Sequence, residues 1–289
     1  MDEFLDQIIQ GDVIKTLKKI PDESIDLIFT DPPYGITNSI RPGREANPDY
    51  HLTHAYIRAQ AFNFEEWDKF ENQEEFFRWT WLWLDEAIRV LKSGRMIISY
   101  FDKGQVNFLS KYLTDRGFLC RGYYADCKQN PAPQVKKYKW MGDWEIIGLW
   151  KKPKGKPYID IKYGHTLKDW GVRKVVRGHA RFDHPTQKPI PLVERFIRYG
   201  TREGEIVLDP FIGSGTTALA AKYTNRRFIG IEKQEKYVNL AQERLKQSHI
   251  TYAPVQQSDE KEKGEVEGTA SGDDSDTLFP QKTGSEMQM

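Results

Sequence analysis

The chain has 289 residues, of which 38% are hydrophobic and 29% charged, and its formal net charge is +1. This length suffices for one α/β domain with an insertion, and the apolar content excludes a chain that is disordered throughout. No apolar run reaches transmembrane length, there is no signal-peptide core, and Cys120 and Cys127 are too few for a disulfide framework. We therefore expect a reduced, cytoplasmic protein without membrane association.

Charge is distributed unevenly along the chain. Residues 251–289 hold nine acidic and three basic residues, a composition that predicts a disordered acidic tail. Residues 128–188 contain fifteen Lys or Arg against five Asp or Glu, interleaved with Tyr and Trp. Such a stretch suits binding to a polyanion such as nucleic acid, and it equally suits a solvated basic surface.

In chain order, the first half predicts strands and helices around one long loop. A buried strand over 24–30 must stop at Asp31-Pro32-Pro33-Tyr34, because proline cannot donate to a strand ladder. Residues 36–70 lack periodicity, as functional or disordered loops do. The other elements expected here are a strand at 8–10, helices at 13–19, 73–91 and 103–115, and strands at 95–101, 118–125 and 144–150, the last two antiparallel.

The second half gives a clearer alternation after an unassigned stretch. Residues 151–183 have no periodicity that predicts an element. Beyond them we expect a helix at 189–200, a strand at 205–208, a helix to 223, a strand at 227–231 and a helix at 234–246. Strands that alternate with helices predict an α/β fold, with a mostly parallel sheet flanked by helices.

A glycine-rich turn follows the strand at 205–208. Gly213-Ser214-Gly215-Thr216 opens the next helix, and Glu232 ends the next strand 19 positions after Gly213. This layout is typical of a nucleoside-binding unit, in which glycines admit the ligand and the carboxylate accepts bonds from ribose hydroxyls. The alternative is a plain strand-to-helix turn. Thr216 stands where a phosphate-binding loop needs Lys, and Asp209 could meet the methionine amino group of S-adenosylmethionine, which favours that cofactor over a nicotinamide.

The Asp31-Pro32-Pro33-Tyr34 turn suits methylation of an aromatic amine, although an ordinary turn is the alternative. The lone pair of such an amine is delocalised into the base, so acceptors at both N–H bonds would direct it toward the methyl group. We expect Asp31 and the Pro32 carbonyl to be these acceptors, Pro33 to stiffen the turn, and Tyr34 to stack on the base. The target atom lies inside a duplex, so the base must flip out.

Together these residues resemble the DNA amino-methyltransferases of prokaryotic restriction–modification systems. The Asp31–Tyr34 turn is similar to their catalytic motif, and Phe211-Ile212-Gly213-Ser214-Gly215 to their cofactor motif. His184-Pro185-Thr186-Gln187-Lys188-Pro189 resembles the segment that opens their cofactor-binding half, and Trp67-Asp68 with Glu86–Lys92 resembles their helix after the catalytic loop. The catalytic motif precedes the cofactor motif, as in their permuted β class.

The resemblance implies a site and a division of the chain. The implied cofactor-binding residues are Asp12 at the adenine end, Glu232 at the ribose, and Thr186, Lys188, Asp209, Phe211, Gly213, Ser214, Gly215 and Thr216. The resemblance divides the chain into a catalytic half at 1–150, a target-recognition region at 151–183, a cofactor-binding half at 184–250 and the tail at 251–289. The implied DNA contacts are Arg41, Arg44, Asn130, Arg173, Lys174 and Arg177.

We therefore expect site-specific, S-adenosylmethionine-dependent methylation of adenine N6 in DNA. Asp31 favours adenine, because the cytosine-N4 enzymes more often carry Ser there. The alternatives are cytosine N4, an RNA or protein-glutamine methyltransferase, a nicotinamide enzyme and a non-catalytic DNA-binding subunit. We expect no metal, hypothesise a homodimer and a cognate restriction endonuclease, and interpret Trp79, Trp81 and Trp83 as core or a subunit contact.

Overall fold

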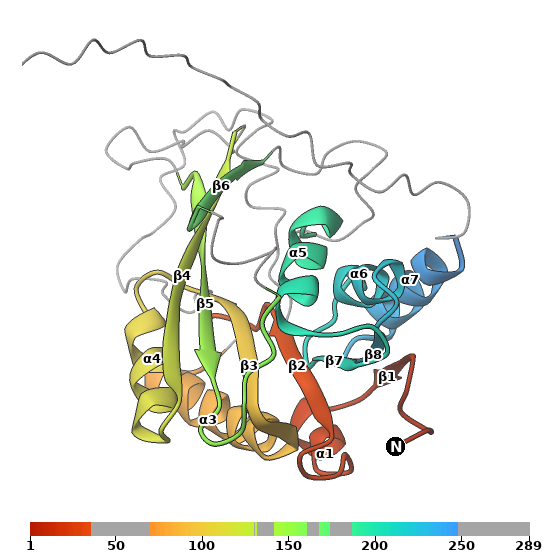
Figure 1. Cartoon of the computed structure of the whole chain (residues 1–289), viewed down its shortest axis with the longest axis horizontal. Coiled ribbons are helices and arrows are strands. Elements are labelled where there is room, and N and C mark those ends of the chain that lie inside the picture. The colour runs from red at the N-terminus through yellow and green to blue at the C-terminus, as the bar shows by residue number, and fades with distance from the viewer. Residues whose placement is uncertain (36–69, 130, 132–141, 161–167, 174–186, 248–289) are drawn as a thin grey trace, which may run out of the picture. The chain divides into compact units, whose positions relative to one another are not determined.

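The computed structural model describes residues 1–35, 70–129, 131, 142–160, 168–173 and 187–247, which contribute eight strands to one sheet (Figure 1). The strands are β1 Gln7–Gln10, β2 Ile25–Thr30, β3 Leu91–Phe101, β4 Leu119–Lys128, β5 Trp144–Lys151, β6 Trp170–Arg173, β7 Ile206–Asp209 and β8 Arg227–Glu232. The helices are α1 Val13–Leu17, α3 Gln73–Val90, α4 Val106–Asp115, α5 Ile190–Gly200, α6 Thr216–Tyr223 and α7 Glu235–Gln247.

The sheet order is β1-β8-β7-β2-β3-β5-β4-β6. The first five strands of this order pair in parallel, β5 pairs antiparallel with both β3 and β4, and β6 lies parallel to β4 at the edge. This confirms the predicted mostly parallel α/β sheet and the antiparallel pairing of the strands at 118–125 and 144–150.

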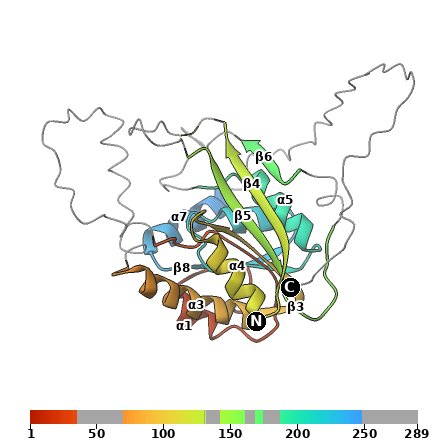
Figure 2. The same ribbon diagram turned by 90° about the vertical axis from the view of Figure 1, so that its left-hand side faces the viewer.

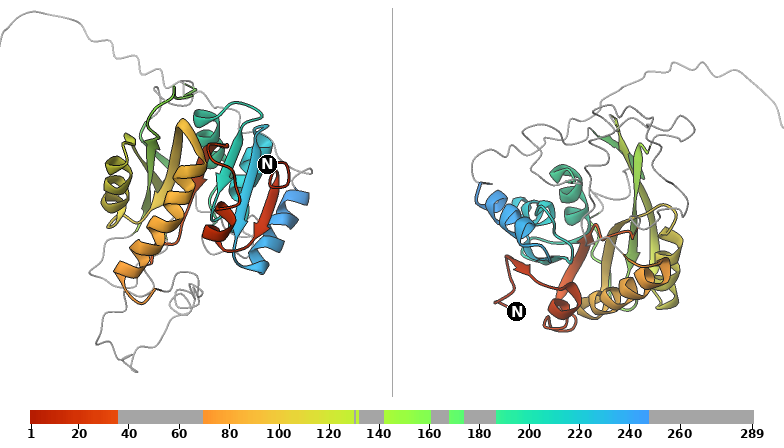
Figure 3. Two further views of the ribbon diagram at one scale, coloured as in Figure 1. Left: turned by 90° about the horizontal axis from the view of Figure 1, so that it is seen from below. Right: turned by 180° about the vertical axis from the view of Figure 1, so that it is seen from behind.

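Helices cover both faces of the sheet, which forms the middle layer (Figure 2 and Figure 3). On β2, Ile28 packs into the cluster that includes α1, α3 and α4, whereas Leu27 and Phe29 pack into the cluster that includes α5, α6 and α7. The alternation follows from the two-residue period of a strand, and it buries β2 on both faces. None of the helices in the described ranges is long and apolar enough to cross a membrane.

Strands β1 and β8, which are far apart in the chain, pair at one edge of the sheet. Gln10 of β1 pairs with Glu232 of β8, and the Gly11 N–H donates to the Glu232 carbonyl at 2.9 Å. Gly11 therefore stands beside Glu232. Strand β1 thus pairs with the edge of β8, although 222 positions separate the paired residues Gln10 and Glu232 in the chain.

Two expectations about elements were wrong in detail. Helix α3 ends at Val90 and β3 begins directly at Leu91, not at Arg95, because Leu91 already has extended backbone angles. Strand β6 was not expected, since its four residues are too few to show a period. Of the three tryptophans interpreted as core or a subunit contact, Trp83 is confirmed as core because it is fully buried. Trp79 and Trp81 are partly buried and pack against the same cluster.

Candidate active site

The carboxyl ends of adjacent parallel strands bring the two predicted motifs together. Strand β2, which leads into Asp31, lies beside β7, which ends at Asp209, and Ile28 pairs with Leu208. Strand β8, which ends at Glu232, lies on the other side of β7. Open α/β sheets bind their ligands outside the carboxyl ends of the strands, which is where both motifs lie.

Glycine is required in the turn between β7 and α6. Gly215 has a φ of +81° at the start of α6, and a Cβ there would lie 2.8 Å from the Ala241 Cβ of α7. Gly213 has a φ of +50°, and its N–H donates to Glu232 Oε2 at 3.1 Å, while the Gln234 N–H donates to Oε1 at 2.8 Å. Burial raises the pKa of the Glu232 carboxyl, although these backbone donors act in the opposite direction.

The Asp209 carboxylate accepts its hydrogen bonds from residues of the turn that follows β7 and from the start of α6. Its Oδ1 accepts from the Phe211 N–H at 3.0 Å and its Oδ2 from the Thr217 hydroxyl at 2.6 Å. The side chain is buried, and burial raises its pKa to about 7. In this structure Asp209 therefore fixes the turn, and its predicted contact with the methionine amino group stays a prediction.

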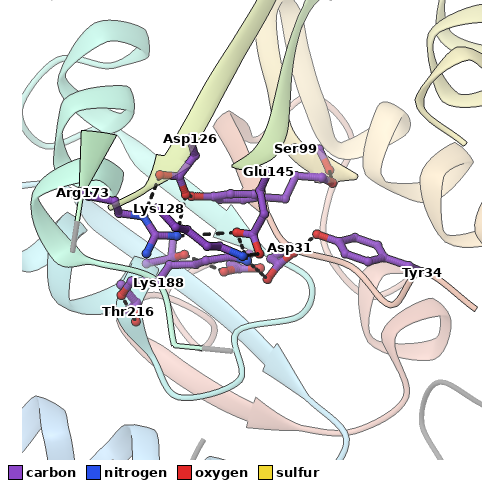
Figure 4. A network of polar contacts seen from close by, with 12 residues as sticks. Asp31, Tyr34, Ser99, Asp126, Lys128, Glu145, Arg173, Lys188 and Thr216 are labelled. Carbon is purple, nitrogen blue, oxygen red and sulfur yellow. Dashed lines mark hydrogen bonds and ion pairs between the residues drawn. The ribbon is translucent and has the colours of Figure 1, made fainter. Parts of the chain in front are cut away.

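The carboxylate of Asp31 already accepts a hydrogen bond from an amine. The Lys188 ammonium donates to Asp31 Oδ2 at 2.8 Å and to Glu145 Oε2 at 3.1 Å, and it lies 4.2 Å from the centre of the Tyr100 ring (Figure 4). Burial alone would lower the pKa of Lys188, but the two carboxylates outweigh it and raise that pKa. The cofactor contact predicted for Lys188 stays a prediction.

Tyr34 occupies the other oxygen of the same carboxylate. Its hydroxyl donates to Asp31 Oδ1, and its ring meets Phe101 edge-on with 6.0 Å between ring centres. Burial, followed by the negative charges of Asp31 and Glu145, raises the pKa of Tyr34, so the hydroxyl remains a donor. Stacking of Tyr34 on a base, as expected from the sequence, stays a prediction.

Glu145 and its neighbours form a polar network that sequence reasoning missed. Glu145 Oε1 accepts from Lys128 at 2.7 Å, and the neighbouring ammonium groups lower the Glu145 pKa to about 2 against the opposing effect of burial. Beside it Arg173 makes two bonds of 2.6 Å to Asp126, which also accepts from the Tyr100 hydroxyl at 3.2 Å (Figure 4).

The register of two strands explains why these residues meet. Asp126 of β4 pairs directly with Glu145 of β5, which places two acidic side chains side by side and requires nearby cations. The antiparallel pairing was predicted, but its register was not, so the sequence held no signal for this cluster.

The remaining predicted residues are placed only in part. Arg173 is 15% exposed and points inward to Asp126, so a contact with DNA stays a prediction and would require it to leave that carboxylate. Asp12 caps α1 by accepting from the Lys15 N–H at 3.0 Å, and Ser214 and Thr216 are buried in the glycine turn, where Phe211 packs against Trp83. Those outside the described residues are Arg41, Arg44, Asn130, Lys174, Arg177 and Thr186.

Comparison with known proteins agrees with this geometry. The N6_N4_Mtase family, described as DNA methylase, matches residues 25–243. The chain is 31% identical to Type II methyltransferase M.HinfI of Haemophilus influenzae, over 86% of this chain and 70% of that protein. It is also 31% identical to Type II methyltransferase M2.DpnII of Streptococcus pneumoniae, over 84% of this chain and 91% of that protein.

A solved structure of the M1.HpyAVI–SAM complex matches with a TM-score of 0.62 and 25% identity, covering 83% of this chain and 98% of that one. These matches confirm the predicted activity, methylation of DNA with S-adenosylmethionine as methyl donor. The chain belongs to the DNA methylases.

Proposed function

We propose that this DNA methylase transfers the methyl group to N6 of an adenine that has left the base stack. The observation that carries the proposal is the 2.8 Å bond between Asp31 and an ammonium group. This bond supports a role for the carboxylate, at the end of β2, as an acceptor for an N–H of an amine.

The chain's own residues fit the cofactor. Gly213 and Gly215 carry no side chains, so the turn presents backbone at these two positions, while Glu232 keeps acceptor capacity beyond the two backbone bonds to its oxygens. S-adenosylmethionine supplies an electrophilic methyl group, and the N–C bond forms as the S–C bond breaks.

Asp31 then has two roles in the transfer. It accepts one N–H of the base, so that the nitrogen lone pair is directed at the methyl group, with the Pro32 carbonyl as the second acceptor. It also stabilises the positive charge that arrives on this nitrogen before the proton is lost to water. The reaction thus depends on placement and electrostatics, and it uses neither a metal nor a covalent enzyme–base intermediate.

Adenine is proposed over cytosine because Asp31 is the residue typical of the adenine-N6 enzymes that the chain resembles. The name of the matched family covers N6 and N4 methylation alike. We also propose that residues 151–183 read the target sequence, that the motif order reflects the permuted class, and that the protein works in the cytoplasm. A homodimer and a cognate endonuclease complete the proposal for a restriction–modification setting.

Mass analysis of nucleosides tests this function. Unmethylated genomic DNA is incubated with the protein and S-adenosylmethionine and is then digested to nucleosides. We expect N6-methyladenine with the wild type, none with Asp31→Ala, and wild-type levels with Glu205→Gln, which removes a carboxylate from an ion pair at the start of β7. N4-methylcytosine would overturn the base assignment, and full activity of Asp31→Ala would overturn the role of the turn.

A further inference from the structure

The ammonium of Lys188 occupies the position that the mechanism reserves for the substrate. It donates to Asp31 Oδ2, while the Tyr34 hydroxyl donates to Oδ1, so both oxygens of the carboxylate already have donors. Methyl transfer deposits positive charge on the base nitrogen. A lysine that neutralises Asp31 at that moment would remove the stabilisation that the transition state needs.

A second carboxylate lies within reach of the same ammonium. The Lys188 Nζ lies 3.1 Å from Glu145 Oε2 and 2.8 Å from Asp31 Oδ2, so the ammonium contacts both carboxylates at once and stays paired with Glu145 if it moves away from Asp31. The ammonium also lies 4.2 Å from the centre of the Tyr100 ring, whose face attracts a cation.

Glu145 is itself held in place for this role. Its Oε1 accepts from Lys128 at 2.7 Å, which leaves Oε2 directed at Lys188, and strand β5 fixes its backbone between β3 and β4. Glu145 carries the negative charge that Lys188 requires if it is to leave Asp31 inside the protein, where an unpaired ammonium is costly.

We propose that Glu145 is a positioning residue, which takes over the ammonium of Lys188 from Asp31 when the amino group of the target base binds. The inference rests on the proposed role of Asp31 and adds Glu145 and Lys188 to it. In the free protein Lys188 keeps the carboxylate paired. In the complex with DNA, the handover leaves Asp31 with its full charge facing the base.

Removal of the Glu145 charge is the direct test. In Glu145→Gln, Asp31 becomes the carboxylate on which Lys188 depends, so the lysine stays there and opposes the developing charge. We expect kcat, measured with labelled S-adenosylmethionine and unmethylated genomic DNA, to fall by about 100-fold. The dissociation constant for S-adenosylmethionine, measured by calorimetry, should stay within about twofold of the wild type.

A double variant separates the handover from a structural role. In Glu145→Gln/Lys188→Met the competing ammonium is gone, and we expect kcat to recover at least about tenfold over Glu145→Gln. If Glu145 had only a structural role, the second substitution would lower kcat further. The matched control is Glu205→Gln, which breaks an ion pair with Arg95 at the start of β7, at the opposite end of that strand from the site. It should leave kcat unchanged.

Two results would overturn the inference while leaving the proposed function intact: a Glu145→Gln protein with wild-type kcat, or a double variant no better than Glu145→Gln. An inactive wild type would instead refute the proposed function. Should Glu145→Gln not fold, Glu145→Asp keeps the charge but withdraws it by one methylene. It should then give an intermediate kcat, and a value equal to the wild type would contradict the handover.

Discussion

Gly215 gives a quantitative test of the proposed role of the glycine turn in cofactor binding. In Gly215→Ala the backbone must keep a φ of +81°, and the new Cβ would lie 2.8 Å from the Ala241 Cβ. The left-handed conformation costs an L-residue about 1–2 kcal/mol, and overpacking of a filled contact costs about 1–3 kcal/mol. We therefore expect the free energy of unfolding to fall by about 2–5 kcal/mol.

Gly204 supplies the matched control, because it shares the conformation without the contact. Its φ is +79°, and a Cβ there would meet nothing within 4 Å. Gly204→Ala should therefore lose only the conformational part, about 1–2 kcal/mol. The difference between the two variants isolates the packing against α7.

Urea unfolding of both variants, together with calorimetric binding of S-adenosylmethionine, measures the effect. Gly215→Ala should also bind the cofactor more weakly, because the turn is displaced. The affinity should fall by about tenfold for each 1.4 kcal/mol of binding free energy that is lost. Gly204→Ala lies at the opposite end of β7 and should bind normally. Equal destabilisation by the two substitutions would refute the packing argument, and normal binding by Gly215→Ala would refute the placement of the cofactor.

Two further predictions concern buried charges. Burial raises the Asp209 pKa to about 7 from an unfolded value near 3.8, so the folded state binds the proton more tightly and stability should fall as pH rises, by about 1.4 kcal/mol per unit between pH 4 and 7. Urea unfolding of Asp209→Asn at pH 5 and 7 should show a flatter dependence, and an unchanged slope would contradict this origin. Arg173→Met leaves Asp126, 1% exposed, without its cation and should cost about 3–5 kcal/mol in thermal or urea unfolding. Arg173→Met/Asp126→Leu should regain most of that loss, and a double variant as unstable as the single one would count against a buried pair.

The sequence predicts the parts of this site that depend on local order along the chain. Asp31 and Gly215 each follow a strand with a clear apolar pattern, and the parallel arrangement of those strands places both at one edge of the sheet. Glu145 could not be found in this way, because its role depends on which residue of β4 it faces. A shift of one position would have turned its side chain to the opposite face of the sheet.

Longer-range placement of charged side chains was equally beyond the sequence. Arg173 was expected to contact DNA because it lies in the implied target-recognition region. In this structure it bonds to Asp126, and the DNA contact stays a prediction. A local excess of positive charge does not say which cation is matched by a buried carboxylate on a neighbouring strand. Lys188 shows the same effect, since its partners Asp31 and Glu145 come from segments 157 and 43 positions away.

The alignment of the two motifs is fixed at the far end of the strands that carry them. Asp26, at the start of β2, accepts from the Ile206 N–H of β7 at 3.1 Å and forms ion pairs with Lys92 and Arg95 of β3. Because Asp26 is buried and its partners come from both neighbouring strands, a slip of β2 by one residue would leave a carboxylate unpaired. The same register holds Asp31 level with the end of β7. The placement of Asp31 relative to the glycine turn is therefore set by the register of neighbouring strands.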